Sequence, residues 1–446
     1  MQFLTLAMIL CVTCTEFLVN LGFLPQLFKY LPELFTALFL IYIVVAGVAQ
    51  RFQSIHPKYW LAFGSLFIVI ISGALANHVE VGPIVAGARA LMKAAPLFFV
   101  AAVYPFNERQ IRLQLLLVAG IALIQVPLAI AQRLWVTSQG RQTGDLITGT
   151  LRISSILSIF QICTVCVLVA LLVRKRLSRS AFIFLFLLIL IPTTINETKG
   201  TLFLLPIGLL AAVLVAAEPG RRLQIALWST ILLVGFGTLF IPIYNSMRGE
   251  NKTRLEQILT QDSLEERMYK NAQVGTYGEY SVGRGDALAV SIKEIAKDPA
   301  RLVFGLGIGN ASMSSLSPTF TGKYAVRLDK FTFLSLSLFL LEIGTLGTAI
   351  VLILHWLILR DAQFLAHRHA GFMGAVSAGW VGVTVVMTIA LAYKAIHTFE
   401  SLSYLFWYFS GLVASQRMRL EKLPSRKPYE SHSRSLQIRN VRGQPA

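Results

Sequence analysis

Long runs of apolar residues are the feature that most constrains how this chain can fold. Residues 115–131 and 181–193 are two such runs, and neither contains a charged side chain. A segment of about 18 or more mostly apolar residues is typical of a helix that spans a bilayer. Only 14% of the 446 residues are charged, against about 25% in soluble domains. The sequence therefore predicts an all-α, polytopic membrane protein and excludes the soluble fold classes.

The apolar runs divide the chain into about twelve predicted membrane-spanning helices. Nine of them fill residues 1–243 and three fill residues 331–415, with one large external loop between them. The predicted spans lie near residues 4–23, 32–50, 59–77, 83–104, 113–133, 151–173, 180–196, 200–217, 223–243, 332–359, 371–393 and 399–415.

The distribution of basic residues predicts the orientation in the membrane. Alternate connections (51–58, 108–112, 174–179, 218–222 and 360–368) hold twelve basic residues against three acids, and the tail 416–446 adds eight against two. Cytoplasmic loops are enriched in Lys and Arg. We therefore expect a multi-pass protein of the cytoplasmic (inner) membrane with both termini in the cytoplasm. The basic tail is predicted to be disordered, in contact with membrane lipids, and this distribution excludes nucleic acid as a partner.

Residues 244–330 form the one long hydrophilic connection, which we place on the external (periplasmic) side. Its 87 residues hold 12 of the 40 basic residues and 10 of the 22 acids. Apolar residues recur at helical spacing over Lys252–Met268 and again over Asp286–Lys297, before Pro299. We expect a small, mostly helical subdomain that packs over the membrane part.

Neither a metal nor a cofactor is predicted. The pairs Cys11/Cys14 and Cys163/Cys166 lie inside apolar runs, where a free cysteine behaves as a small hydrophobic residue. Residues 305–310 read Gly-Leu-Gly-Ile-Gly-Asn, but without the strand and helix that surround a dinucleotide-binding loop. We interpret this segment as a tight turn of closely packed backbone.

Charged residues inside spans are costly and usually functional. Arg89 and Lys93 are four residues apart, so both lie on one face of the fourth predicted span, which has no acid of its own to compensate them. Either an anion binds between these two cations, or each of them reaches the interface or pairs with Glu16 or Glu342.

Cations on the external side suggest what that anion would be. Positive charge is unusual on this side, and a bound phosphate or pyrophosphate would explain it, since the guanidinium of arginine donates two hydrogen bonds to phosphate oxygens. The predicted cluster contains Arg89, Lys93, Arg133, Arg141, Arg152, Lys199, Arg284 and Lys394.

Three segments, in this order, resemble the O-antigen ligase and polymerase superfamily. Residues 196–201 (Asn-Glu-Thr-Lys-Gly-Thr) stand where members of the superfamily typically have Ser-Arg-Gly. Residues 283–310 look like its loop signature, with Gly-Arg, a short helix, a proline and a glycine-rich turn. Residues 333–347 resemble its span opening, an apolar run followed by E-x-G-x-x-G that begins here at Glu342.

The resemblance implies a metal-independent, inverting glycosyltransferase at the external face of the cytoplasmic membrane, without a cofactor. The donor would be a glycan on undecaprenyl pyrophosphate and the acceptor another lipid-linked glycan or lipid A core. Other polysaccharide-assembly proteins are possible partners. Arg284 and Lys199 would be catalytic, Arg89, Lys93 and Arg152 would bind the pyrophosphate, and Glu342 would be a supporting carboxylate.

The sequence departs from the pattern at two positions, and the second departure, a missing histidine, favours a polysaccharide polymerase or a divergent member over a lipid A-core ligase. Lys199 replaces an arginine of the superfamily, which keeps the charge but loses the planar fork. The histidine of the superfamily, which is proposed to assist the acceptor hydroxyl, would fall near Phe333. The chain has no histidine between His78 and His355.

Two other functions remain open from the sequence. A transporter or flippase for lipid-linked or anionic substrates would use the same cations along its path, although the sequence has no internal repeat. A non-catalytic scaffold within a polysaccharide-assembly complex is the third possibility.

Overall fold

The computed structural model describes residues 1–49, 55–140, 144–247 and 283–422, and within them the secondary structure consists of helices without strands. The helices are α1 (Gln2–Asn20), α2 (Leu31–Val48), α3 (Pro57–Ala76), α4 (Val81–Met92), α5 (Ala95–Val103), α6 (Glu108–Ser138), α7 (Ser154–Val173), α8 (Arg179–Ile195), α9 (Thr201–Ala216), α10 (Arg222–Met247), α13 (Arg284–Ile295), α14 (Pro299–Phe304), α15 (Ala325–Leu328), α16 (Ser335–Arg368), α17 (Phe372–Ala390) and α18 (Glu400–Lys422). Short 3-10 turns η1 (Gln26–Tyr30), η2 (Gly144–Leu146), η3 (Pro219–Arg221), η4 (Pro318–Phe320), η5 (Asp329–Phe331) and η6 (Ile396–Thr398) connect them.

Within the described residues, seven helices are long and apolar enough to cross a membrane: α1, α2 with its preceding turn η1, α3, α6, α7, α16 and α17. Helices α8 and α9 are apolar but shorter. The chain is therefore an all-α membrane protein, as predicted. Each of the twelve predicted ranges falls on a helix or helix pair. In the described residues, seven helices meet the length and hydropathy of a span, or eight if the bent pair α4 and α5 is one span.

The range predicted as one span over residues 83–104 is divided into α4 and α5, which meet at a bend of 43°. Pro96 lies in the first turn of α5. Proline lacks a backbone N–H, so Pro96 cannot continue the hydrogen bonds of α4, and the helical bonding is interrupted here. The break leaves Arg89 and Lys93 at the carboxyl end of α4, where the residues of a helix end are free to contact other segments.

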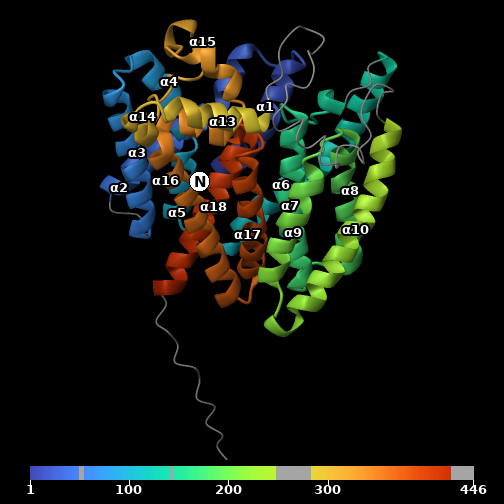
Figure 1. Ribbon diagram of the computed structural model, residues 1–446. Coiled ribbons are helices and arrows are strands. Elements are labelled where there is room, and N and C mark those ends of the chain that lie inside the picture. Colours follow the sequence, from blue (N-terminus) through green and yellow to red (C-terminus); the bar gives the residue numbers. More distant parts are fainter. Residues whose placement is uncertain (50–54, 141–143, 248–282, 423–446) are drawn as a thin grey trace, which may run out of the picture.

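The helices form one bundle with two distinct ends (Figure 1). At one end, which we call the loop end, α13, α14 and α15 lie across the bundle. At the other end, which we call the tail end, α18 finishes at Lys422. The predicted helix over Asp286–Lys297 is confirmed as α13, whereas the helix predicted over Lys252–Met268 lies outside the described residues.

The tail end is held together by a buried carboxylate. Asp361 on α16 is 1% exposed, accepts a hydrogen bond of 2.7 Å from the hydroxyl of Tyr59 and forms ion pairs with Lys58 and Arg417. Arg419 donates to the carbonyl of Phe106 at 2.7 Å. These contacts extend α18 to Lys422, so the prediction that disorder begins at residue 416 is wrong for residues 416–422; the rest of the tail lies outside the described residues.

The glycine-rich segment 304–310 packs against a break in α16. Gly305, Gly307 and Gly309 have φ of 73°, 90° and 73°, and Gly344 inside α16 has φ of 66°. A Cβ on Gly305 would meet the backbone carbon of Glu342 and the nitrogen of Gly344, each at 2.6 Å. This confirms the interpretation of the segment as closely packed backbone.

We predict that Gly305→Ala lowers the stability of the protein by at least about 2 kcal/mol, because it adds both backbone strain and a clash with α16. Gly64→Ala is the matched control, since a Cβ there meets nothing within 4 Å, and it should leave the protein unchanged or slightly more stable. Thermal unfolding in detergent measures both changes. Equal midpoints for the two variants would contradict the packing described here.

Candidate functional site

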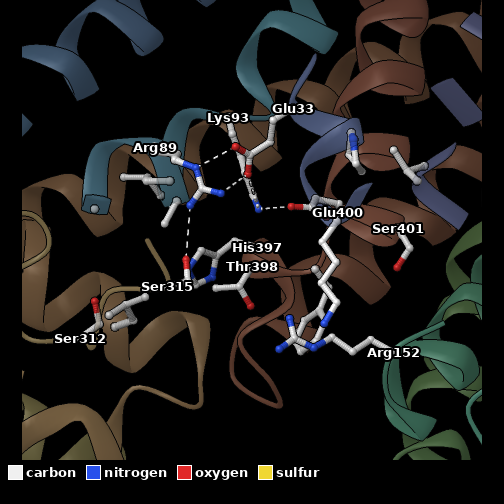
Figure 2. Close-up of a pocket in the computed structure, with 18 of the residues that line it drawn as sticks. Glu33, Arg89, Lys93, Arg152, Ser312, Ser315, His397, Thr398, Glu400 and Ser401 are labelled. Carbon is white, nitrogen blue, oxygen red and sulfur yellow. Dashed lines mark hydrogen bonds and ion pairs between the residues drawn. The ribbon is translucent and has the colours of Figure 1, made fainter. Parts of the chain in front are cut away.

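A cavity of about 430 Å³ opens at the loop end of the bundle (Figure 2). Segments far apart in the sequence form its wall: α1, the start of α2, the end of α4, the residues before α7, the segment after α14, α16, and η6 with the start of α18. Four of the six predicted site residues line the cavity: Arg89, Lys93, Arg152 and Glu342.

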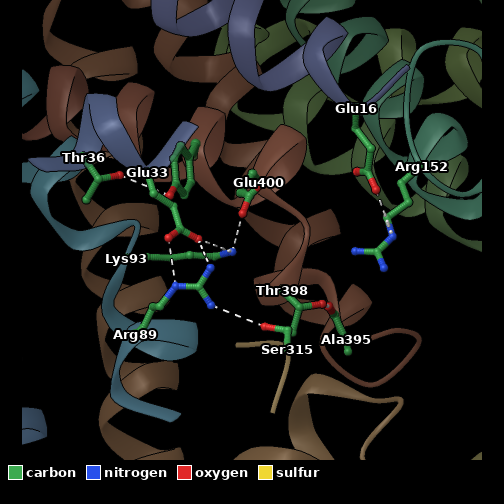
Figure 3. Close-up of polar contacts among 11 residues, drawn as sticks. Glu16, Glu33, Thr36, Arg89, Lys93, Arg152, Ser315, Ala395, Thr398 and Glu400 are labelled. Atoms are coloured by element: carbon green, nitrogen blue, oxygen red, sulfur yellow. Dashed lines mark hydrogen bonds and ion pairs between the residues drawn. The ribbon is translucent and has the colours of Figure 1, made fainter. Parts of the chain in front are cut away.

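Arg89 and Lys93 are joined to two carboxylates by a chain of ion pairs (Figure 3). Arg89 donates to both oxygens of Glu33, with 2.8 Å between Nε and Oε2. Lys93 Nζ lies 2.5 Å from Glu400 Oε1 and 4.0 Å from Glu33 Oε1. One of the two predicted alternatives was an anion bound between these cations. An anionic group does lie between them, and it is the carboxylate of Glu33. The predicted pairing with Glu16 or Glu342 is wrong for these residues.

Helix dipoles explain why these charges meet. Glu33 and Glu400 lie in the first turns of α2 and α18, where backbone N–H groups favour a negative charge. Arg89 lies in the last turn of α4, and Lys93 is the residue that caps it, where free carbonyl groups favour a positive charge. The end of α4 before the bend therefore places Arg89 and Lys93 beside the first turns of α2 and α18.

Arg152 lies on the other side of the cavity (Figures 2 and 3). Its Nε is 3.2 Å from Glu16 Oε1 and its side chain is 60% exposed, the highest value among the cavity's ion-paired cations. It also stacks over the ring of Phe399 at 5.8 Å. Arg152 therefore has most of its hydrogen-bonding groups available to a molecule that enters the cavity.

The cavity is charged but close to neutral. Its lining carries the cations Lys29, Arg89, Lys93 and Arg152 and the carboxylates Glu16, Glu33, Asp329, Glu342 and Glu400. An anion that binds here must compete with carboxylates that already hold the cations.

His397 is a cavity residue that the sequence did not identify as functional. Its Nδ1 lies 2.8 Å from the hydroxyl oxygen of Ser335, and that hydroxyl donates to the carbonyl of Lys394 at 3.2 Å. With the hydroxyl proton directed at Lys394, Nδ1 would carry the ring proton and Nε2 would be an acceptor. Burial, together with the charge of Lys93, lowers the pKa of His397 to about 3, so the ring is neutral at physiological pH.

Glu342 has a structural role in the cavity wall. Its carboxylate accepts a hydrogen bond of 2.6 Å from the hydroxyl of Ser312 and further bonds from the backbone of Gly309, Ala311 and Ser312. These bonds stabilise the carboxyl group of a side chain that is 4% exposed and fix the segment that follows the glycine-rich turn. Glu342 thus holds the loop against α16 and does not pair with Arg89 or Lys93.

Arg284 and Lys199 are not part of the cavity lining. Arg284 donates to the carbonyl of Tyr393 at 3.2 Å and lies 4.5 Å from the centre of its ring. Gly200, next to Lys199, also approaches that ring, since a Cβ on Gly200 would lie 2.7 Å from it. The two predicted catalytic residues therefore belong to segments that meet at Tyr393, on the connection that also carries His397.

Two of the remaining members of the predicted cation cluster lie in the described residues but do not line the cavity, namely Arg133 and Lys394. Arg133 forms an ion pair of 3.0 Å with Glu197. Lys394 lies beside Tyr393, where burial and the nearby charge of Arg284 lower its pKa. Arg141 lies outside the described residues. In the part of the chain that the structure describes, no group of three or more His, Cys, Asp or Glu side chains could hold a metal ion.

We predict that acid destabilises the protein partly through His397. Its folded pKa is below the ordinary 6.5, so its contribution to stability is complete above pH 6.5 and is lost as the pH falls towards 3. Thermal unfolding midpoints between pH 7 and pH 4 should therefore fall more steeply for the wild type than for His397→Gln. Parallel pH profiles would show that the ring is not held in its neutral form.

The chain was compared with models of known protein families and with curated protein sequences, and neither comparison gives a match. The function is therefore inferred from the residues and their geometry.

Proposed function

We propose that this chain is a membrane glycosyltransferase that joins glycans carried on undecaprenyl pyrophosphate, and that it acts as a polysaccharide polymerase. One observation carries the proposal: a single cavity gathers Arg89, Lys93 and Arg152 from two separate segments at one end of an apolar helix bundle. A lipid-linked pyrophosphate has an anionic part at the membrane surface and an apolar chain in the bilayer. The cavity and its surrounding helices offer groups that suit both parts.

The proposed reaction needs no metal or cofactor. An acceptor hydroxyl attacks the anomeric carbon of the donor glycan and forms the new glycosidic bond with inversion. The bond between that carbon and the pyrophosphate oxygen breaks, and its electron pair stays on the pyrophosphate. Cations fixed near the leaving group stabilise the charge that develops there. Arg89, Lys93 and Arg152 would perform this role.

The carboxylates of the cavity give these cations a resting state. Glu33, Glu400 and Glu16 hold them when no substrate is bound, which avoids uncompensated charge in a partly buried site. A pyrophosphate would first meet Arg152, whose side chain is the most exposed of the three, and then displace carboxylates from Arg89 and Lys93. The return of the carboxylates would favour release of the product.

His397 is the group that we assign to the acceptor proton. Its deprotonated Nε2 can accept a proton from a hydroxyl. The charge of Lys93 helps to keep the pKa of His397 low, and a bound pyrophosphate would offset that charge and favour protonation of the ring. His397 would thus take the role of the superfamily histidine that is missing near Phe333. Although distant in the sequence, it contacts Ser335, two residues after Phe333.

Arg284 and Lys199 enter the proposal as positioning residues. The guanidinium of Arg284 binds the carbonyl and the ring of Tyr393, and so fixes the α17–α18 connection on which His397 lies. Lys199 belongs to the segment that packs on the same ring. Lysine in place of Arg284 would keep the charge but lose the planar stack.

The proposed membrane arrangement has twelve spans, with the loop end outside and the tail end in the cytoplasm. Contacts such as Lys58–Asp361, Arg174 with the carbonyl of Ala366, and Arg176 with the carbonyl of Ala370 bring the basic connections together at the tail end. Positive charge marks the cytoplasmic side. Both termini would then be cytoplasmic, and the cavity would face the periplasm.

A transporter is the second candidate, and one observation favours it. A small apolar cavity of about 40 Å³ shares Phe339 and His397 with the site cavity. It also shares Met387 and Phe406 with a third cavity that reaches the tail end. Three cavities in series could mark a path through the bundle. The middle one is too small for a glycan, which is why we favour the enzyme.

Arg152→Ala tests the proposed enzyme in cells. A strain that lacks the chain should make single lipid-linked units but no long surface glycan, and the wild-type gene should restore the long chains. Arg152→Ala should reduce restoration by about 100-fold, because it removes one charge from the leaving-group site. Arg221→Ala, at the tail end, is the matched control and should restore them fully. Equal restoration by both variants, measured on a glycan gel, would contradict the proposal.

A reporter fusion tests the proposed orientation. The reporter is an enzyme that is active only outside the cytoplasm. A reporter fused after Asn271 should be active, and a reporter fused at the C-terminus should be inactive. The reverse pattern would place the site cavity on the cytoplasmic side and exclude an external reaction.

A further inference from the structure

A second large cavity lies towards the tail end, between α6, α7, α17 and α18. Its volume is about 560 Å³, and apolar side chains form most of its wall, among them Leu168, Trp380 and Phe409. None of the residues that form the ion-pair network of the site cavity lines this second cavity. We call it the lipid cavity, for the reasons that follow.

Three basic side chains mark one end of the lipid cavity: Arg112, Lys175 and Arg176. Arg112 lies 4.7 Å from the centre of the Phe372 ring and forms an exposed ion pair with Glu108 at 3.1 Å. Arg176 donates to the carbonyl of Ala370 at 3.2 Å, which leaves other N–H groups of its guanidinium for a ligand. For Lys175, the described residues provide no ion pair.

The backbone places Lys175 and Arg176 at this position with strain. The amide of Arg176 bonds to the carbonyl of Leu171 at 2.7 Å, and the amide of Lys175 bonds to that of Leu172 at 2.9 Å. These two bonds form a Schellman motif at the end of α7, in which glycine is the usual residue at the left-handed position. Lys175 occupies that position with φ of 56°. A lysine at this position therefore places a basic side chain at the cavity wall at a cost in backbone strain.

The depth of the cavity matches a lipid chain. Phe372 and Met387, both in its wall, are separated along α17 by about 22 Å, at about 1.5 Å per residue. One leaflet of the hydrocarbon core is about 15 Å thick. A chain whose headgroup lies beside Lys175 would therefore run along the cavity for the full depth of its leaflet.

We propose that the lipid cavity binds one anionic phospholipid, with its phosphate held by Arg112, Lys175 and Arg176 and an acyl chain between α6 and α17. Charge complementarity selects an anionic headgroup, and basic pockets between membrane helices bind such lipids in general. This site is separate from the proposed glycan chemistry at the loop end and does not depend on it.

The test uses the full-length, delipidated protein and native mass spectrometry. Phosphatidylglycerol and phosphatidylcholine with identical acyl chains are titrated separately. The wild type should bind one phosphatidylglycerol far more tightly than phosphatidylcholine. The triple variant Arg112→Gln, Lys175→Gln, Arg176→Gln should bind phosphatidylglycerol about 100-fold more weakly, since each basic residue contributes about a fivefold gain.

Two further variants separate this site from a general attraction of basic surfaces for lipid. The matched control Arg109→Gln, Arg179→Gln, Arg221→Gln removes three charges outside the cavity lining and should keep the tight site. Ala119→Phe, which fills the cavity from α6, should lose it. Equal affinity for the two lipids, equal weakening by both triple variants, or a retained tight site in a folded Ala119→Phe protein would each overturn the proposal.

Lys175→Gly removes the charge without a risk to folding. Glycine suits the left-handed position, so this variant should unfold at a higher temperature than the wild type in lipid-free detergent. Its affinity for phosphatidylglycerol should nevertheless fall about fivefold. A variant that is more stable and binds the lipid as tightly as the wild type would show that Lys175 takes no part in the site.

Discussion

The seating of the glycine-rich turn in the break of α16 is the contact on which the site cavity depends. Gly305 and Gly344 approach so closely that neither can carry a side chain, and Leu306 donates to the carbonyl of Leu341 at 2.6 Å. Asn77, which caps α3, donates to the carbonyl of Gly305 at 3.1 Å. The carboxylate of Glu342 accepts hydrogen bonds from backbone amides at and beyond the end of the turn. Because of these bonds, a hydrophilic connection becomes one wall of a cavity in the membrane part.

The ion pairs give that cavity a second property: its cations are held by carboxylates that another anion could replace. Helix starts hold Glu33 and Glu400, and the broken end of α4 holds Arg89 and Lys93. A pair buried this way contributes little net stability, because the desolvation of both charges offsets their attraction. In the proposed reaction, a pyrophosphate would replace one of these carboxylates, so that the cations would keep an anionic partner.

The sequence predicted the helices well, because apolar runs must be buried in lipid or protein wherever they occur. It also predicted α13 and the close packing of residues 305–310, since glycine spacing is a local property. It did not identify Glu33 or His397. The partner of Glu33 is 56 residues away and that of His397 is 62 residues away, so only the packing of α2, α4 and α16 brings them together. An acid in the first turn of a span, beside Pro32, was the one local signal for Glu33.

Turnover by purified protein in detergent micelles is the most direct test of the proposed enzyme. Micelles have no compartments, so a transporter cannot produce a signal, whereas a transferase still forms a covalent product. With a labelled glycan on undecaprenyl pyrophosphate as both donor and acceptor, we predict longer lipid-linked glycans and one free undecaprenyl pyrophosphate for each glycosidic bond formed, without added metal. A donor that remains unchanged, beside protein that is folded and binds it, would contradict the account.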